Sequence, residues 1–156
     1  MKEKKKTFNV QRLTFNAQRG ERVAEEPGAY STREKKDAET TFDLEDRLLE
    51  FTVRLLKLVD ALPTSRVGNH IAGQLLRCGT SPFANHGEVQ AAESRNDFIH
   101  KLRVCLKELK EIKRWLRLIA RLELIPPRRV RLLLIETEEL IKIFSASIRT
   151  AEKNAT

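Results

Sequence analysis

The fold of this chain is decided by residues 94–122, SRNDFIHKLRVCLKELKEIKRWLRLIARL. Apolar residues recur there in alternating steps of four and three, the spacing of a helix with one side packed against other helices. This apolar side comprises Phe98, Leu102, Cys105, Leu109, Ile112, Leu116 and Ile119. Ser94 is the predicted N-cap, with Asp97 in the capping-box position. The stretch is therefore predicted to be a long helix buried along one side.

The opposite side of this helix is basic. At about 100° per residue, six cations fall within a sector of roughly 80° that points away from the apolar side. They are Arg103, Lys107, Lys110, Arg114, Arg117 and Arg121, and no acidic residue shares their sector. The two signs of charge are thus sorted by face and not alternated as i,i+4 ion pairs would be.

Length and charge bound the class of protein. The 156 residues suffice for one domain with a core, and the net charge of +8 points either to an anionic partner or simply to solubility. No apolar run approaches the about 18 residues of a membrane span, and the N-terminus lacks a hydrophobic signal core. We therefore expect a soluble, cytoplasmic protein without a membrane partner. Cys78 and Cys105 are predicted to be small buried hydrophobes.

Residues 1–41 differ from the rest of the chain. They hold ten Lys/Arg and seven Asp/Glu, few apolar residues and no sustained period. Such a segment cannot bury enough apolar surface to offset its chain entropy. We predict a disordered charged tail over 1–41 and a helical domain over 42–156. The lysines at positions 2 and 4–6 either add non-specific affinity for nucleic acid or are simply solvated.

Two further helices are predicted on either side of the central region. The first runs over 43–62, with Asp43 as N-cap and Pro63 ending it. The last has Pro127 in its first turn and runs to about residue 153. Their expected apolar sides are Leu44, Leu48, Phe51, Leu55, Leu58 and Leu62 in the first, and Val130, Leu134, Thr137, Ile141, Phe144, Ile148 and Ala151 in the last.

The stretch 65–93 contains Gly79 and Pro82, which are strong helix breakers. Because the apolar spacing continues across them, we predict one helix kinked at Pro82; a break into two helices at Gly79–Pro82 is the alternative. The expected inward residues are Ile71, Leu75, Cys78, Pro82, Asn85, Val89 and Ala92. The amide of Asn85 would then need a partner, such as the carbonyl left free by Pro82.

Four long helices with short connections and no strand pattern predict an all-α, up-down-up-down antiparallel four-helix bundle. Several apolar residues are left over beside the buried sides of the last two helices. They are Trp115, Leu118, Leu122, Leu132, Ile135 and Ile143. Extra apolar surface on a small bundle is typical of subunit contacts, so we expect a homo-oligomer.

Residues 80–119 carry a further signal, TSPFANHGEVQAAESRNDFIHKLRVCLKELKEIKRWLRLI. This stretch resembles the signature of the four helix bundle protein family, also called the 23S rRNA intervening-sequence protein family, which includes the accessory variability protein of diversity-generating retroelements. The resemblance spans about residues 42–153. Its matching positions are Gln74-Leu75-Leu76-Arg77, Asn85, Glu88, Ala92-Glu93-Ser94, Asp97-Phe98-Ile99 and Trp115-Leu116-Arg117-Leu118.

The chain departs from the family pattern at one place. Many members carry Asn-Ile-Ala-Glu-Gly where this chain has Asn85-His86-Gly87-Glu88-Val89. The resemblance implies a ring-shaped homo-oligomer, a pentamer. In the retroelement branch it further implies a basic barrel that binds a reverse transcriptase and nucleic acid.

Catalytic and metal-binding patterns are missing from the sequence. A di-iron bundle needs Glu-x-x-His motifs, and the nearest match is a single Asp97-Phe98-Ile99-His100. No Cys/His spacing fits zinc, and no phosphate loop, nucleophile elbow or catalytic triad order occurs. We expect a non-enzyme without cofactor or metal.

The basic face is the candidate functional site. Its like charges repel by about 0.2 to 0.5 kcal/mol for each i,i+4 pair, and arginines in the first turn of the last helix oppose the helix dipole by about 0.3 to 1 kcal/mol each. An anionic ligand bound at this face would turn both unfavourable contributions into favourable ones. In an up-down bundle these two groups lie near each other. The predicted residues that contact RNA or DNA backbone are Arg103, Lys107, Lys110, Arg114, Arg117, Arg121, Arg128, Arg129 and Arg131.

Other interpretations of the basic face remain. The face is either an ordinary solvated surface, or it meets an acidic protein partner in an interaction scaffold, or it belongs to a structural oligomer without a ligand. Trp115 is expected to pack beside the apolar side of its helix and not to serve as a base-stacking platform.

Overall fold

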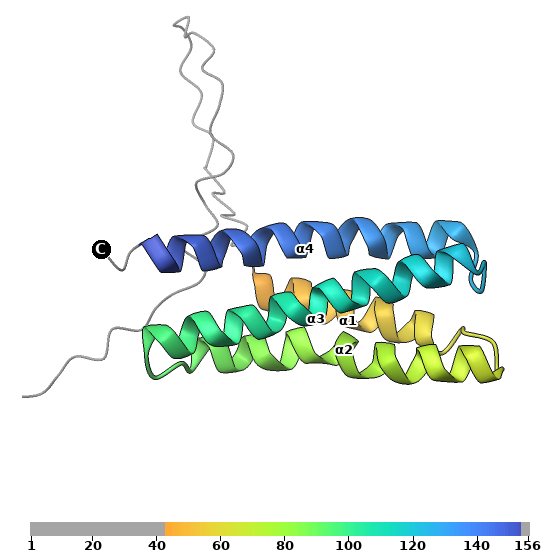
Figure 1. Ribbon diagram of the computed structural model, residues 1–156, viewed down its shortest axis with the longest axis horizontal. Coiled ribbons are helices and arrows are strands. Elements are labelled where there is room, and N and C mark those ends of the chain that lie inside the picture. Colours follow the sequence, from red (N-terminus) through yellow and green to blue (C-terminus); the bar gives the residue numbers. More distant parts are fainter. Residues whose placement is uncertain (1–42, 154–156) are drawn as a thin grey trace, which may run out of the picture.

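A computed structural model describes residues 43–153 of the chain. They form four helices, α1 (Leu44–Val59), α2 (Arg66–Gln90), α3 (Arg95–Arg121) and α4 (Pro127–Lys153). The chain reverses direction at each connection (Figure 1), and α1 and α3 each pack against both α2 and α4. The predicted all-α fold of four helices is confirmed for this part of the chain. The tail predicted for 1–41 lies outside the described residues.

Helix α3 supplies the centre of the core. All seven apolar residues predicted for its inward side are at most 2 % exposed. Its partners across the core include Phe51 of α1 and Phe144 of α4, which are fully buried. The heptad spacing therefore predicted correctly which side of this helix is removed from water. None of the four helices described is both long and apolar enough to cross a bilayer.

The helix ends follow local rules, with two corrections. Helix α1 ends at Val59, before the predicted end at residue 62, because Pro63 disfavours a helical residue before it and the last turn tightens into i,i+3 hydrogen bonds. Ser94 caps α3 as predicted, accepting a hydrogen bond from the Asp97 N–H. The Asp97 carboxylate does not close a capping box, because it accepts instead from the N–H of Glu93.

The turn between α3 and α4 has a feature that composition does not reveal. Glu123 adopts a left-handed conformation, with a φ of 53°. The Leu124 N–H donates to the Ile119 carbonyl and the Glu123 N–H to the Ala120 carbonyl, which is the Schellman pattern that satisfies the last carbonyls of a helix. Because glycine usually occupies this position, its absence hid the motif from sequence analysis.

Helix α2 passes through Pro82 without a break, so the one-helix prediction is confirmed and the alternative break at Gly79 is wrong. The kink itself stays a prediction. Helices α1 and α2 approach closely at Gly79, where a Cβ atom would lie 2.6 Å from the end of the Leu55 side chain. Cys105 of α3 donates a thiol hydrogen bond to the Pro82 carbonyl, with 3.7 Å between sulfur and oxygen.

The inward side of α2 corrects the prediction for Asn85. His86 is buried, at 1 % exposed, whereas Asn85 is only half-buried on the flank of the helix. The Asn85 amide donates to the carbonyl and hydroxyl of Ser81, and not to the carbonyl that Pro82 leaves free. Spacing alone did not separate the two positions, because a step of three or of four from Pro82 continues the pattern equally well.

His86 is a buried polar group without a hydrogen bond. Within residues 43–153 neither ring nitrogen has a partner, and the ring packs edge-on against Phe144, with 6.4 Å between centroids. Burial lowers the pKa of His86 from 6.5, against the weaker opposing pull of Glu45 and Asp43. The folded protein therefore holds this imidazole neutral.

Replacing His86 by isoleucine, an apolar residue of helical bundles, is expected to stabilise the fold. The change removes an unsatisfied polar group, which raises the free energy of unfolding by about 1 to 2 kcal/mol at pH 7.5. Because burial lowers the pKa of His86 in the folded state, burying this imidazole costs least above pH 6.5, and the free energy of unfolding decreases as pH falls below that value. Urea denaturation between pH 7.5 and 5 should show that the free energy of unfolding decreases less with falling pH in H86I than in the wild type. Equal slopes in H86I and wild type would contradict the assignment.

Helix α4 also shows a shift of its buried side. Leu133 and Leu140 are buried, whereas the predicted Leu134 and Ile141 are half-buried beside them. Residues 132–135 are all apolar, so spacing could not select among them. The packing of α4 against both α1 and α3 decides which leucine points into the core.

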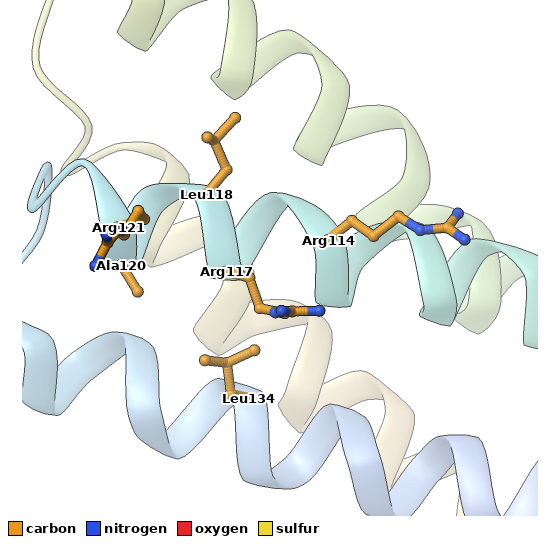
Figure 2. A pocket seen from close by; sticks show the side chains of 6 residues that line it. All are labelled: Arg114, Arg117, Leu118, Ala120, Arg121 and Leu134. Atoms are coloured by element: carbon orange, nitrogen blue, oxygen red, sulfur yellow. The ribbon is translucent and has the colours of Figure 1, made fainter.

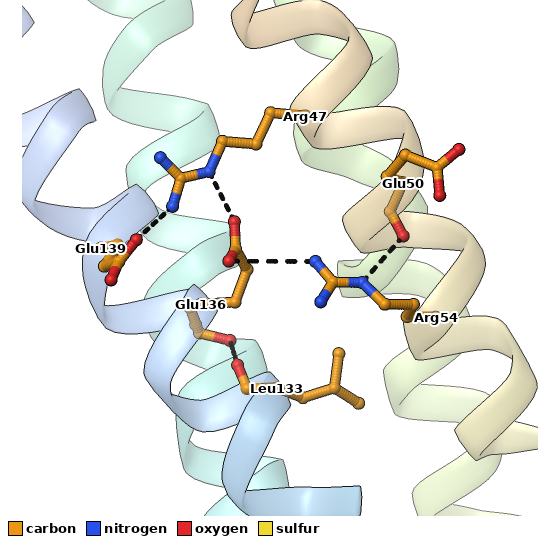
Figure 3. Close-up of polar contacts among 7 residues, drawn as sticks. Arg47, Glu50, Arg54, Leu133, Glu136 and Glu139 are labelled. Atoms are coloured by element: carbon orange, nitrogen blue, oxygen red, sulfur yellow. Dashed lines mark hydrogen bonds and ion pairs between the residues drawn. The ribbon is translucent and has the colours of Figure 1, made fainter.

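Helices α1 and α4 are joined by ion pairs at their outer edge (Figure 3). The Arg47 guanidinium donates to Glu136, at 2.6 Å between Nε and Oε1, and also to Glu139. Glu136 additionally lies 3.9 Å from Arg54. These contacts pair cations of α1 with acids of α4. Glu136 and Glu139 are therefore already occupied by arginines of α1.

Candidate nucleic-acid interface

One end of the bundle is strongly basic. Residues 112–135, which include the end of α3 and the start of α4, contain seven Lys/Arg and one acidic residue, Glu123. The apolar side of each helix is buried, so the cations must lie outward or along the groove between the two helices. The sequence of these two helix ends therefore concentrates positive charge at one end of the molecule.

Three arginines of α3 surround one open depression (Figure 2). Arg114, Arg117 and Arg121 line it, and its volume is about 650 Å³. Its apolar lining is formed by Leu118, Ala120 and Leu134. In Figure 2, Leu134 rises from α4 toward Arg117, and Leu118 projects from the opposite side of α3. The depression thus combines three guanidinium groups with a small apolar surface.

The acidic residues of α4 within the described part of the chain form ion pairs with cations other than the three lining arginines. Glu136 and Glu139 pair with Arg47 of α1. Glu138 pairs with Lys113 at 2.8 Å, and Glu152 pairs with Arg103 at 2.7 Å. Because no acid precedes Glu136 in α4, the part of α4 that faces the end of α3 offers no carboxylate.

The three arginines are therefore left without a counter-charge. Among residues 43–153, no carboxylate lies within ion-pair distance of Arg114, Arg117 or Arg121, and all three are exposed. The hydrogen bond from Lys113 lowers the pKa of Glu138, and Arg117 lowers it further through its charge. The field of Arg117 thus reaches Glu138 without forming a contact.

The other predicted cations do not join this group. Arg103 is paired with Glu152, and Lys107 lies 3.8 Å from the adjacent Glu108. Arg129 donates to the backbone carbonyl of Lys57, which directs its guanidinium toward α1. The remaining three, exposed but outside the lining, are Lys110, Arg128 and Arg131. The structure gathers three of the nine predicted residues around one surface feature.

The apolar lining of the depression does not follow from the residue spacing. The spacing places Leu118 in surplus apolar surface and Leu134 in the core. Leu118 is 39 % exposed and Leu134 is half-buried, so both reach the depression. The available signal was that Leu118 directly follows Arg117 and thus borders the basic sector.

Trp115 is half-buried and packed, as predicted. Its indole N–H donates to Glu111 at 3.2 Å, and its ring meets His70 edge-on with 6.0 Å between centroids. Cys78 and Cys105 are buried free thiols, and burial raises the pKa of each to about 12. Both cysteines therefore stay protonated and act as small hydrophobes. Over residues 43–153, no three His, Cys, Asp or Glu side chains gather as metal ligands.

Comparisons with known proteins agree with this architecture. A crystal structure of a protein of unknown function from the S23 ribosomal protein family of Bacteroides thetaiotaomicron shares 36 % sequence identity, with a TM-score of 0.64. The match covers 68 % of this chain and 98 % of that chain. No curated protein matches the sequence. A family profile described as 23S rRNA-intervening sequence protein matches residues 42–146, so this chain belongs to the 23S rRNA-intervening sequence protein family.

Proposed function

We propose that this chain is a cytoplasmic, non-enzymatic protein that binds the phosphate backbone of RNA or DNA through the basic end of its bundle. The observation that carries the proposal is the group formed by Arg114, Arg117 and Arg121. These three cations face solvent, and the acids of α4 are all committed to other partners. Phosphate groups would supply the missing counter-charge and relieve the repulsion among the three arginines.

The proposal includes self-association into a ring-shaped homo-oligomer, a pentamer. Exposed leucine and isoleucine side chains on α4 support self-association, since Leu132 is 53 % and Ile135 is 49 % exposed. Repetition around a ring would multiply the three arginines into a basic belt with many phosphate contacts. The resemblance to the accessory variability protein supports a reverse transcriptase as a protein partner, which a neighbouring reverse transcriptase gene would favour.

Salt dependence tests the backbone contact directly. Fluorescence anisotropy with a labelled 20-base-pair duplex, measured from 50 to 300 mM NaCl, is expected to give affinity that falls linearly on a log–log plot. Replacing Arg117 by glutamine should reduce the slope by about 0.9 for each phosphate that the arginine neutralises. Replacing Arg103, which Glu152 already neutralises, should change the slope less.

The alternative is an interaction scaffold whose basic face meets an acidic protein. It predicts weak, unsaturable binding of nucleic acid and a salt dependence of the affinity that is the same with and without Arg117. Either result would contradict the proposed function. The comparison of Arg117 with Arg103 matters because both changes remove one positive charge from the same helix face.

A further inference from the structure

We propose that the depression at Arg114, Arg117 and Arg121 takes an unpaired base of single-stranded nucleic acid, together with its flanking phosphates. This inference rests on the proposed function and specifies the form of nucleic acid that the site prefers. It starts from the composition of the lining, which is half cationic and half apolar.

The apolar half of the lining is not explained by phosphate binding. A surface that contacts only phosphates needs cations and polar groups, whereas Leu118 and Leu134 add hydrocarbon to this lining. Leaving this hydrocarbon in water has a free-energy cost that an apolar part of the ligand would remove. The fitting ligand therefore has an anionic part and an apolar face within reach of each other.

Single-stranded nucleic acid has both parts. Its bases are unstacked and offer flat apolar faces, and each base lies beside a phosphate of the same strand. In a duplex the base faces are hidden by stacking, so only phosphates would meet this surface. Arginine suits both roles, since its planar guanidinium binds phosphate through two hydrogen bonds and also stacks on bases.

The size and openness of the depression fit this ligand. Its volume of about 650 Å³ lies within the range of about 300 to 1,000 Å³ typical of small-molecule pockets. The nearest aromatic ring along the helix, Trp115, is engaged with Glu111 and His70. Base contact would therefore come from aliphatic side chains and arginine planes, which predicts a moderate gain in affinity.

The test compares two labelled 12-nucleotide DNA strands with the same number of phosphates. One carries bases and the other is abasic at every position, so they differ in the bases and not in the number of phosphates. Fluorescence anisotropy with the full-length chain at 100 mM NaCl is expected to give about five- to tenfold tighter binding of the base-bearing strand. Replacing Leu118 by alanine should lower this ratio and leave the affinity for the abasic strand unchanged.

Matched variants separate the site from general effects. Leu76→Ala removes a leucine of α2 that is 46 % exposed and lies outside the depression, and it should keep the wild-type ratio. Leu134→Ala is the second variant inside the depression, with folding checked by thermal melting because Leu134 is half-buried. It too should lower the ratio.

The outcomes distinguish this inference from the proposed function. Equal affinity for base-bearing and abasic strands would overturn base recognition and leave backbone binding in place. If neither strand nor duplex binds, both the inference and the proposed function fail.

Discussion

Replacing Arg114, Arg117 and Arg121 together by glutamate is expected to lower the affinity for nucleic acid by about 100-fold or more. Each change removes a charge-assisted hydrogen bond to phosphate and puts a repelling carboxylate in its place. Three such bonds worth at least about 1 kcal/mol each correspond to about two orders of magnitude in Kd. Anisotropy titration of the labelled duplex at 100 mM NaCl measures this effect.

A charge-matched control is needed because the triple variant changes the net charge by six units. Lys57, Arg77 and Arg149 are exposed cations on three different helices, and none lines the depression. Their joint replacement by glutamate alters net charge equally but should lower affinity far less. A similar decrease in both variants would assign binding to overall charge and not to the depression. Retained affinity in the first variant would remove the proposed site.

The triple variant should remain folded. The three side chains lie on the surface, and no carboxylate among residues 43–153 depends on them for an ion pair. The three glutamates repel one another as the arginines did, but positions 114 and 117 then face Lys110 and Lys113 at i,i+4 spacing, which turns a repulsion into an attraction of about 0.2 to 0.5 kcal/mol for each pair. Circular dichroism melting is expected to give a Tm no lower than that of the wild type. Weaker binding by the variant would then result from the altered surface and not from unfolding.

Replacing Gly68 by alanine is the change expected to have the largest effect on stability. A Cβ atom at this position would lie 1.9 Å from the backbone carbonyl oxygen of Pro63 and 3.2 Å from the Ser65 hydroxyl. The connection between α1 and α2 folds directly over Gly68, whose N–H donates to Ser65 at 3.0 Å as part of the helix cap. Backbone cannot move aside as a flexible side chain can. We expect the free energy of unfolding to fall by about 2 to 3 kcal/mol.

Gly73 provides the matched control within the same helix. A Cβ atom there meets nothing within 4 Å, so Gly73→Ala should gain helix propensity, about 1 kcal/mol, at no steric cost. Urea denaturation should therefore move the two midpoints in opposite directions. A stabilising effect of Gly68→Ala would show that the connection does not close over this residue as described.

Much of the fold could be predicted from spacing because each helix carries one continuous apolar side. In α3 every seam residue from Phe98 to Ile119 is buried, since charged residues on both flanks leave only one register for the helix. Prediction was less accurate where several registers were equally apolar or equally polar. The run 132–135 in α4 and the pair Asn85 and His86 in α2 are the two examples, and in both the neighbouring helices selected the inward residue.

The candidate site was predicted only in part, for a reason that lies in the fourth helix. A helical wheel places six cations of α3 on one face, but it cannot say which of them meets an acid from another element. Glu152 reaches Arg103, and Glu138 reaches Lys113 next to the basic sector. Arg129 turns toward α1 and away from the arginines of α3. Only three of the nine predicted cations therefore line the depression.

The sequence alone thus determined the four helices, most of their buried sides and the sorting of charge on α3, because these properties depend on residue spacing within one helix. The tertiary structure decided which cations keep a free charge, which leucines border them, and that His86 is buried without a partner among residues 43–153. These properties depend on distances between helices. Such distances are set by packing over the whole core, which no local pattern encodes.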